Sequence, residues 1–279
     1  MRPEGARSLG VGGEVGVVDL LVGAVLLGLL LVLVLAADWP VIKDNFFSPA
    51  GFGNPLEGDW GTWPDLITVG AKNAVIYTVI AFGVGLALAI VLALMRLSPV
   101  GAYRWLATAY IEFFRGLPAL LVVLLMAFGI PIAFQWTPPG GTVGAGVMGL
   151  ILVAGAYMAE TIRAGIQAVP KGQTEAARSL GMSAGRATVT VVLPQAFRIV
   201  IPPLTNEFVL LIKDTALLFV VGFAADQREL TTLSRDLVSS GPTAGTSTSF
   251  IQAAILYLII TLPLTRLVSW LERRQQRAR

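Results

Sequence analysis

The stretch NAVIYTVIAFGVGLALAIVLAL, residues 73–94, runs for 22 residues without a charged side chain. Roughly 20 residues of helix cross the hydrocarbon layer of a bilayer, so this stretch is long enough to span a membrane. The whole chain has the same character, because 55% of its 279 residues are hydrophobic and only 13% are charged. One soluble core of this length cannot bury so much apolar surface. The composition therefore predicts an all-α, polytopic membrane protein.

Six apolar runs of this kind each predict one transmembrane helix. They cover Val18–Ala37, Asn73–Leu94, Leu117–Phe134, Val143–Ile162, Leu204–Phe223 and Phe250–Trp270. Buried helices of a large soluble protein are the alternative, but the runs are too long and too poor in charge for that. The first run follows two arginines and could also be a secretory signal. Its length and the poor cleavage site AADWP, residues 36–40, favour an uncleaved signal anchor.

Lysine and arginine residues set the expected orientation, because they are enriched on the cytoplasmic flanks of membrane spans. With the N-terminus inside, fifteen of the 20 basic residues lie on the cytoplasmic side. The other five are Lys43, Lys72, Lys213, Arg228 and Arg235. We therefore expect residues 1–17 and the basic tail 275–279 in the cytoplasm.

An acidic loop, residues 38–65, then lies outside the cell. Its charged side chains are Asp38, Asp44, Glu57, Asp59 and Asp65 against Lys43 alone. Its tryptophans are typical anchors at the membrane interface. A solvated loop is the favoured interpretation, and contact with an external partner is the alternative.

Some chemistry is excluded by what the sequence lacks. There is no cysteine and no histidine, so disulfides, thiol chemistry and the usual zinc or haem ligands are absent, and we expect no metal site. The phosphate-binding pattern G-x-x-x-x-G-K-[ST] is absent too. The chain is therefore not expected to hydrolyse ATP or to act as an enzyme by itself.

Small residues recur four apart inside the spans, which places each pair on one helix face. The pairs are Gly83 with Ala87, Gly85 with Ala89, and Ala145 with Gly149. Faces without bulk let two helices approach closely. Packing within the bundle is the favoured interpretation, and contact between subunits is the alternative.

A polar loop separates the fourth and fifth spans and contains EAARSLGMSAGRATVTVVLP, residues 175–194. We expect a short helix from Lys171 to Leu180, stopped by Gly181, with Ala176, Ala177 and Leu180 on one shallow face. Ser183 could cap a second helix that ends at Leu193-Pro194. A helix with alanines on its surface fits closely against another protein. An amphipathic loop on the membrane surface is the alternative, although it would prefer larger apolar residues.

This loop resembles the signature loop of ABC importer permeases. The signature is E-A-A, three residues, Gly, nine residues, an aliphatic residue, one residue and Leu-Pro. The matching residues are Glu175, Ala176, Ala177, Gly181, Val191, Leu193 and Pro194. Stretches that begin at Tyr110, Ala156 and Leu193 look like permeases for polar amino acids, the branch that handles histidine, glutamine, glutamate or arginine. The likeness covers roughly 66–274, so the first span and the acidic loop lie outside it.

The resemblance implies a five-helix type I importer core at 66–274, with a coupling loop at 164–195 and one extra N-terminal helix at 18–37. Its implied location is the inner membrane of a bacterial cell, and its substrate is a polar amino acid. The implied partners are two cytoplasmic ATPase subunits, a second permease subunit and an external solute-binding protein. ATP and Mg²⁺ would be bound by the ATPase and not by this chain. A nucleic-acid partner is unnecessary, because the basic residues are explained by orientation.

The same resemblance implies which residues couple the permease to the ATPase. They are Glu175, Ala176, Ala177, Leu180, Gly181, Leu193 and Pro194.

Ionisable and polar residues inside the spans are the candidates for substrate binding, because an intramembrane charge is costly and usually faces the bundle interior. They are Glu207, Asn206, Lys213, Asp214 and Glu160. Helical geometry places Glu207 and Asp214 on one face and Asn206 and Lys213 on an adjacent one. Internal pairing, of Lys213 with Asp214 or of Glu160 with Arg163, is the alternative.

Two other functions use the same residues differently. A proton-coupled secondary transporter would use the intramembrane carboxylates as a proton relay, and a structural membrane subunit would use none of them. Only the ABC importer requires ATP for uptake.

Overall fold

The computed structural model describes residues 16–136 and 138–277. All regular secondary structure in these two ranges is helical, as the composition predicts. The predicted cytoplasmic residues Arg2, Arg7 and Arg279 lie outside the described residues.

Within the described residues, five helical segments are long and apolar enough to cross a membrane. They are Val18–Ala36, Trp63–Leu97, Gly141–Gln167, Ala184–Val220 and Thr248–Gln275. Their main helices are α1 (Val17–Ala36), α5 (Lys72–Leu97), α9 (Gly141–Gln167), α12 (Leu193–Asp214) and α14 (Thr248–Arg277). The second segment begins with α4 (Trp63–Asp65) and η2 (Leu66–Ala71), and the fourth ends with η5 (Thr215–Val220).

The predicted span Leu117–Phe134 is one arm of a bent pair. Helix α6 (Gly101–Gly116) and the arm Ala119–Phe134 meet at an angle of 104°, and the number of spans reaches six only if this pair counts as one. The arm consists of α7 (Ala119–Leu124), η3 (Leu125–Gly129) and α8 (Ile130–Phe134). Leu117 is extended, with φ −96° and ψ 143°, because the proline that follows disfavours helical backbone.

The bundle core lies where α5, α9 and α12 pack together, with α6 and α7 against α9. Small residues allow the close contacts. A Cβ on Gly149 would lie 2.9 Å from the Cα of Val123 in α7, and one on Gly85 would lie 3.4 Å from the carbonyl oxygen of Ile151 in α9. Both glycines therefore serve packing within the bundle, as predicted. Gly83 differs, because a Cβ there would have no atom within 4 Å.

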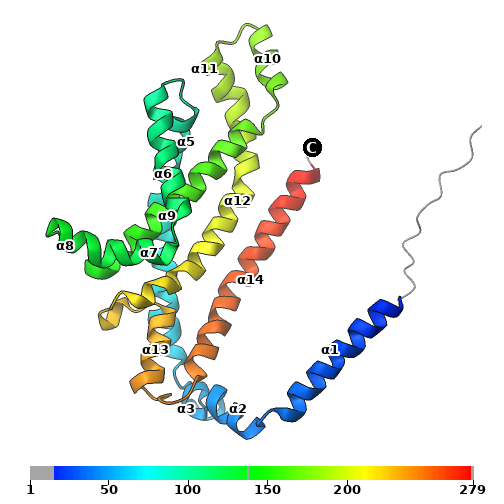
Figure 1. Cartoon of the computed structure of the whole chain (residues 1–279), viewed down its shortest axis with the longest axis vertical. Helices are drawn as coiled ribbons and strands as arrows, with labels where there is room; N and C mark the ends of the chain where they lie inside the picture. Colours follow the sequence, from blue (N-terminus) through cyan, green and yellow to red (C-terminus); the bar gives the residue numbers. More distant parts are fainter. Residues whose placement is uncertain (1–15, 137, 278–279) are drawn as a thin grey trace, which may run out of the picture.

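The two ends of the bundle are different (Figure 1). One end, here the loop end, carries α10 (Lys171–Ser179) and α11 (Ala184–Ala187). The other, here the cap end, carries α2 (Trp39–Phe46), α3 (Pro49–Phe52) and α13 (Leu230–Ser240).

The segment predicted as a solvated acidic loop is helical and docked on the bundle. Asn45 accepts hydrogen bonds from the Ser247 amide at 3.1 Å and, through its carbonyl, from the Thr248 hydroxyl at 3.0 Å. The buried Gln252 of α14 donates to the carbonyl of Gly51 at 2.9 Å. The carboxylates of the segment remain exposed to solvent, as expected of a solvated loop, whereas part of its backbone is helical and packs against α14.

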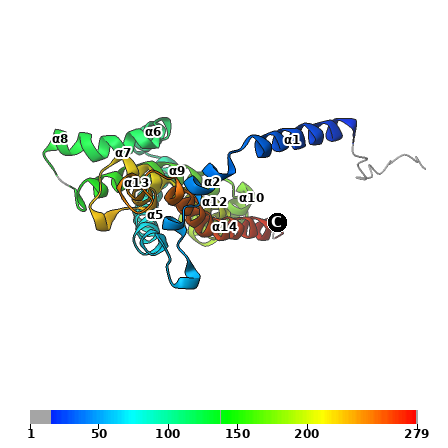
Figure 2. The ribbon, with the colours of Figure 1, turned by 90° about the horizontal axis from the view of Figure 1, so that it is seen from below.

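Helix α1 stands apart from the bundle in both views (Figures 1 and 2). Its leucine and valine side chains are exposed all round the helix. A helix that is apolar on every face suits a lipid environment.

Candidate functional site

A cleft of about 330 Å³ lies between α7, α9 and α12, and we call it the α12 cleft. Its lining residues are Leu117, Ala119, Leu150, Val153, Ala154, Tyr157, Glu207, Leu210, Leu211 and Asp214. The two carboxylates lie seven residues apart on α12, so they share one face, as the sequence predicts. They are the only carboxylates among these lining residues, and the rest of the wall is largely apolar apart from the Tyr157 hydroxyl.

Arg115 lies at the edge of this cleft, which the sequence analysis missed. Its guanidinium carbon is 5.3 Å from the ring centroid of Tyr157, a lining residue. The positive-inside pattern assigned Arg115 to the cytoplasmic flank. Helix α6 instead carries it away from the loop end to the bend before Leu117. The cleft therefore brings together two carboxylates and, at its edge, a cation.

The other candidate residues lie elsewhere. Asn206 and Lys213 are exposed on the adjacent face of α12 and do not line the cleft. Within residues 16–136 and 138–277, no ion pair joins Lys213 to Asp214. Glu160 is half-buried and pairs with Arg163 and, at 2.7 Å, with Arg96. The internal pairing expected as one alternative for Glu160 is therefore present.

The loop end has the predicted short helix with the predicted stop. Helix α10 ends in a Schellman motif: the Met182 amide donates to Ala177 at 3.2 Å and the Gly181 amide to Arg178 at 2.9 Å. Gly181 has φ +86°, which glycine adopts without steric cost. Ser183 caps α11 by accepting from the Arg186 amide at 3.4 Å.

Two details of this loop differ from the expectation. Leu193-Pro194 does not end a helix, because the π-helical turn Thr188–Val192 leads directly into α12. A proline is tolerated in the first turn of a helix, where its missing amide costs little. The three residues expected on one shallow face also separate, since Ala177 is buried while Ala176 is exposed and Leu180 is 82% exposed.

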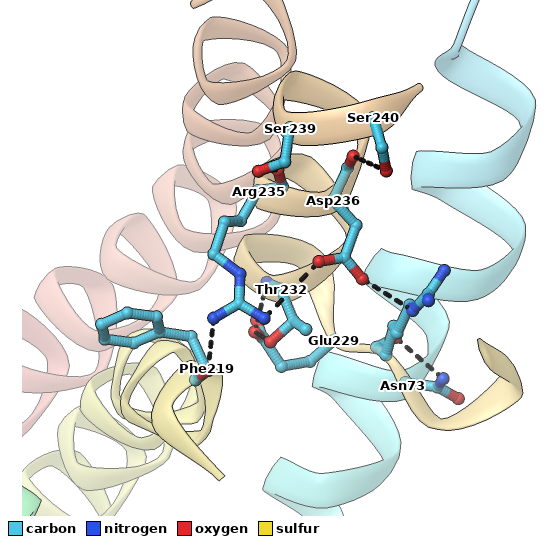
Figure 3. Close-up of polar contacts among 9 residues, drawn as sticks. Asn73, Phe219, Glu229, Thr232, Arg235, Asp236, Ser239 and Ser240 are labelled. Atoms are coloured by element: carbon cyan, nitrogen blue, oxygen red, sulfur yellow. Dashed lines mark hydrogen bonds and ion pairs between the residues drawn. The ribbon is translucent and has the colours of Figure 1, made fainter. Parts of the chain in front are cut away.

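A buried polar cluster holds the cap end together (Figure 3). The fully buried Glu229 caps α13, accepting from the amides of Thr231 at 2.7 Å and Thr232 at 2.6 Å and from the Tyr257 hydroxyl of α14 at 3.2 Å. Burial raises the pKa of the Glu229 carboxyl, although these hydrogen bonds oppose the shift. Asn73 of α5 donates to the carbonyls of Asp226 and Arg228.

A second set of contacts ties α13 to η5, the helical turn that follows α12. Arg235 donates to the carbonyl of Phe219 at 3.2 Å, and Asp236 pairs with Arg228 at 2.8 Å (Figure 3). The cap end therefore joins α5, η5, α13 and α14 in one network.

Comparison with known proteins identifies the family and the fold. Residues 85–277 match the family described as "Binding-protein-dependent transport system inner membrane component". The probable glutamine ABC transporter permease protein GlnM of Bacillus subtilis is 39% identical over 215 residues, covering 75% of this chain and 93% of that protein. The glutamate/aspartate import permease protein GltK of Escherichia coli O157:H7 is 34% identical over 203 residues, covering 71% of this chain and 88% of that protein.

Solved structures agree in fold. An amino acid ABC transporter crystallised with histidines has a chain that is 37% identical, with a TM-score of 0.67, covering 76% of this chain and 94% of that chain. The MetNI methionine ABC transporter, in an inward-facing conformation, aligns with a TM-score of 0.58 at 16% identity, which shows the shared fold alone.

The apolar helices and the family match define a membrane component of a transport system. The chain belongs to the family of binding-protein-dependent transport system inner membrane components, and it is a permease subunit of an ABC importer. In this family a separate partner subunit hydrolyses ATP. The predicted resemblance to ABC importer permeases is confirmed.

Proposed function

We propose that this chain forms one half of the translocation path for a polar amino acid. The α12 cleft carries this proposal, because it offers Glu207 and Asp214 to an ammonium group and Arg115 to a carboxylate. An amino acid zwitterion bears both groups. The relatives named for glutamine and for glutamate and aspartate support the same substrate class.

Glu207 is the proposed principal ligand of the substrate ammonium, with Asp214 two turns further along α12. Asn206 and Lys213, exposed on the adjacent face, are placed where a second permease subunit could complete the path. Glu160 acts differently in this proposal: its two arginine partners fix α9 against α5, so that it supports the path without binding substrate.

The loop end is the proposed docking site for the cytoplasmic ATPase, which binds ATP and Mg²⁺. Helix α10 presents Glu175, Ala176 and Leu180 on its exposed side, while Ala177 packs inward. Gly181 fixes the turn that follows α10, and Leu193-Pro194 begin α12. Both termini then lie in the cytoplasm of a bacterial cell, and the cap end faces the external solute-binding protein.

The test is uptake by the importer, with its ATPase and binding protein, in proteoliposomes. Glu207→Gln keeps the shape of the side chain but removes its charge. Losing a hydrogen bond to a charged group costs about 1.5–3 kcal/mol, so we expect the uptake KM to rise roughly 10- to 100-fold with assembly preserved. Glu112→Gln is the matched control, since Glu112 is exposed on α6 and does not line the cleft. Unchanged uptake kinetics in a well-assembled Glu207→Gln importer would refute the ligand role.

The energy source separates this function from the alternatives. An ABC importer accumulates substrate only when ATP is present inside the vesicles. Uptake driven by a proton gradient without ATP would instead show a secondary transporter. Assembly without any uptake would show a structural subunit.

A further inference from the structure

The loop end carries a second cavity, a groove of about 430 Å³ between α12 and α14. Its lining residues are Arg198, Ile201 and Pro202 from α12 and Leu271, Arg274 and Gln275 from α14. The groove thus combines two guanidinium groups with an apolar floor of isoleucine, proline and leucine. We call it the α12–α14 groove.

Neither arginine is neutralised within the described part of the chain. Among residues 16–136 and 138–277, the carboxylates that pair with arginine are Glu160 and Asp236, and neither contacts Arg198 or Arg274. Arg274 is instead held over the ring of Trp270, with its guanidinium carbon 5.3 Å from the ring centroid. This contact orients the cation at little entropic cost and leaves its hydrogen-bond donors free for an anion.

The groove faces away from the α12 cleft. Arg198 and Glu207 are nine residues apart in one continuous helix, so they point to opposite sides of α12. The groove is therefore on the lipid side if the cleft faces the path, as proposed above. Ile201 and Trp270, which are 45% and 49% exposed, are then side chains that meet lipid at the membrane interface.

We propose that the α12–α14 groove binds the headgroup of an anionic phospholipid. The two guanidinium groups bind the phosphate, and the acyl chain lies along Ile201, Pro202 and Leu271. A free phosphate ion would use the arginines but not the apolar floor. Basic pockets between membrane helices on the cytoplasmic side suit such headgroups, because the arginines supply charge and bidentate donors at the depth of the phosphate.

Fluorescence quenching of Trp270 tests this in the assembled importer. The importer is reconstituted in phosphatidylcholine vesicles that contain a small fraction of brominated phosphatidylglycerol or brominated phosphatidylcholine. The signal of Trp270 is the difference between the unaltered chain and Trp270→Phe. We expect brominated phosphatidylglycerol to quench it more strongly than brominated phosphatidylcholine at equal content.

Arginine variants measure the strength of the site. Each arginine near the surface contributes roughly 1 kcal/mol, so Arg198→Gln or Arg274→Gln lowers the preference for phosphatidylglycerol about fivefold and the double variant about thirtyfold. Arg198→Lys, which keeps the charge, retains most of the preference. Arg273→Gln is the matched control, because Arg273 is exposed on α14 outside the groove.

Four results would overturn the proposal. Equal quenching by the two brominated lipids in the unaltered importer means that the groove does not select an anion. An unchanged preference for phosphatidylglycerol in the double variant means that other residues select the anionic lipid. Quenching by neither lipid means that protein, a second permease or the ATPase, covers the groove. Displacement of the brominated lipid by inorganic phosphate at a similar concentration identifies a free anion as the ligand. None of these results depends on transport, so the proposed substrate path is tested separately.

Discussion

The contact between Gly149 of α9 and the backbone of Val123 in α7 predicts a large effect from a small change. A Cβ at Gly149 would lie 2.9 Å from the Cα and 3.2 Å from the amide nitrogen of Val123. Carbon atoms pack best at about 3.5–4.0 Å, so α7 would have to move by roughly 0.5–1 Å. Backbone cannot rotate away as a flexible side chain can. We therefore expect Gly149→Val to push α7, and with it Leu117 and Ala119 of the cleft wall, away from α9.

The loss of stability caused by Gly149→Val can be compared with that of a matched control variant. Overpacking a well-packed core costs about 1–3 kcal/mol, which corresponds to a fall of roughly 3–10 °C in the melting temperature of a chain of this size. Gly83→Val makes the same substitution in the middle of α5, where the added Cβ would have no atom of another helix within 4 Å. Both substitutions change helix propensity equally, so the difference between the two melting temperatures measures the effect of the clash with α7. The assay is thermal unfolding of the purified importer in detergent, together with uptake. Equal melting temperatures for Gly149→Val and Gly83→Val would refute the reasoning.

Three further experiments test the two ends of the bundle. Glu175→Lys or Gly181→Trp should lower co-purification with the ATPase at least about tenfold while the membrane fold survives, and normal association of both would exclude α10 as the docking site. A cysteine at Asp59 should react with an impermeant thiol reagent added to intact cells and one at Ser179 should not; the opposite pattern reverses the orientation. Glu229→Ala removes the cap of α13 and leaves buried donors unsatisfied, at a cost of about 2–4 kcal/mol, so an unchanged melting temperature would contradict the role given to the cap-end cluster.

Local signals in the sequence predicted local structure well. The stop of α10 at Gly181 and the cap of α11 at Ser183 depend on residues within one or two turns. The shared face of Glu207 and Asp214 depends only on helical spacing within α12. Features of this kind follow from backbone geometry and need no tertiary information.

Contacts between distant segments were not available from the sequence. Glu160 and Arg96 are 64 residues apart in the chain, and their pairing depends on how α9 packs against α5. The position of Arg115 depends on the 104° bend that follows it, because composition cannot show how far into the bundle α6 reaches. The positive-inside rule therefore assigned Arg115 to a cytoplasmic flank of a membrane span, although it lies beside the cleft.

The acidic segment before α5 did contain a signal that composition obscured. Asp38, Ser48 and Asn54 each stand at the start of a short helix with proline in its first turn. A polar cap followed by proline is typical of helix starts. These three helix starts could therefore have been predicted from the sequence, whereas the contacts of Asn45 and Gly51 with α14 could not.

The continuity of the helix after the loop bears on how the two ends of this permease communicate. A stop at Leu193-Pro194 would have placed a flexible joint between the loop and the cleft. Residues 184–220 instead form one helical segment that begins in the loop and carries both Glu207 and Asp214. Helix α10 is attached to it, since Ala177 is buried and the Gln195 amide donates to Gln173 at 3.3 Å. If the ATPase moves α10, as we propose, this continuous helix carries the displacement toward the cleft carboxylates. The two interior prolines, Pro202 and Pro203, lie between the loop and Glu207, where their missing amide donors favour a bend in the helix.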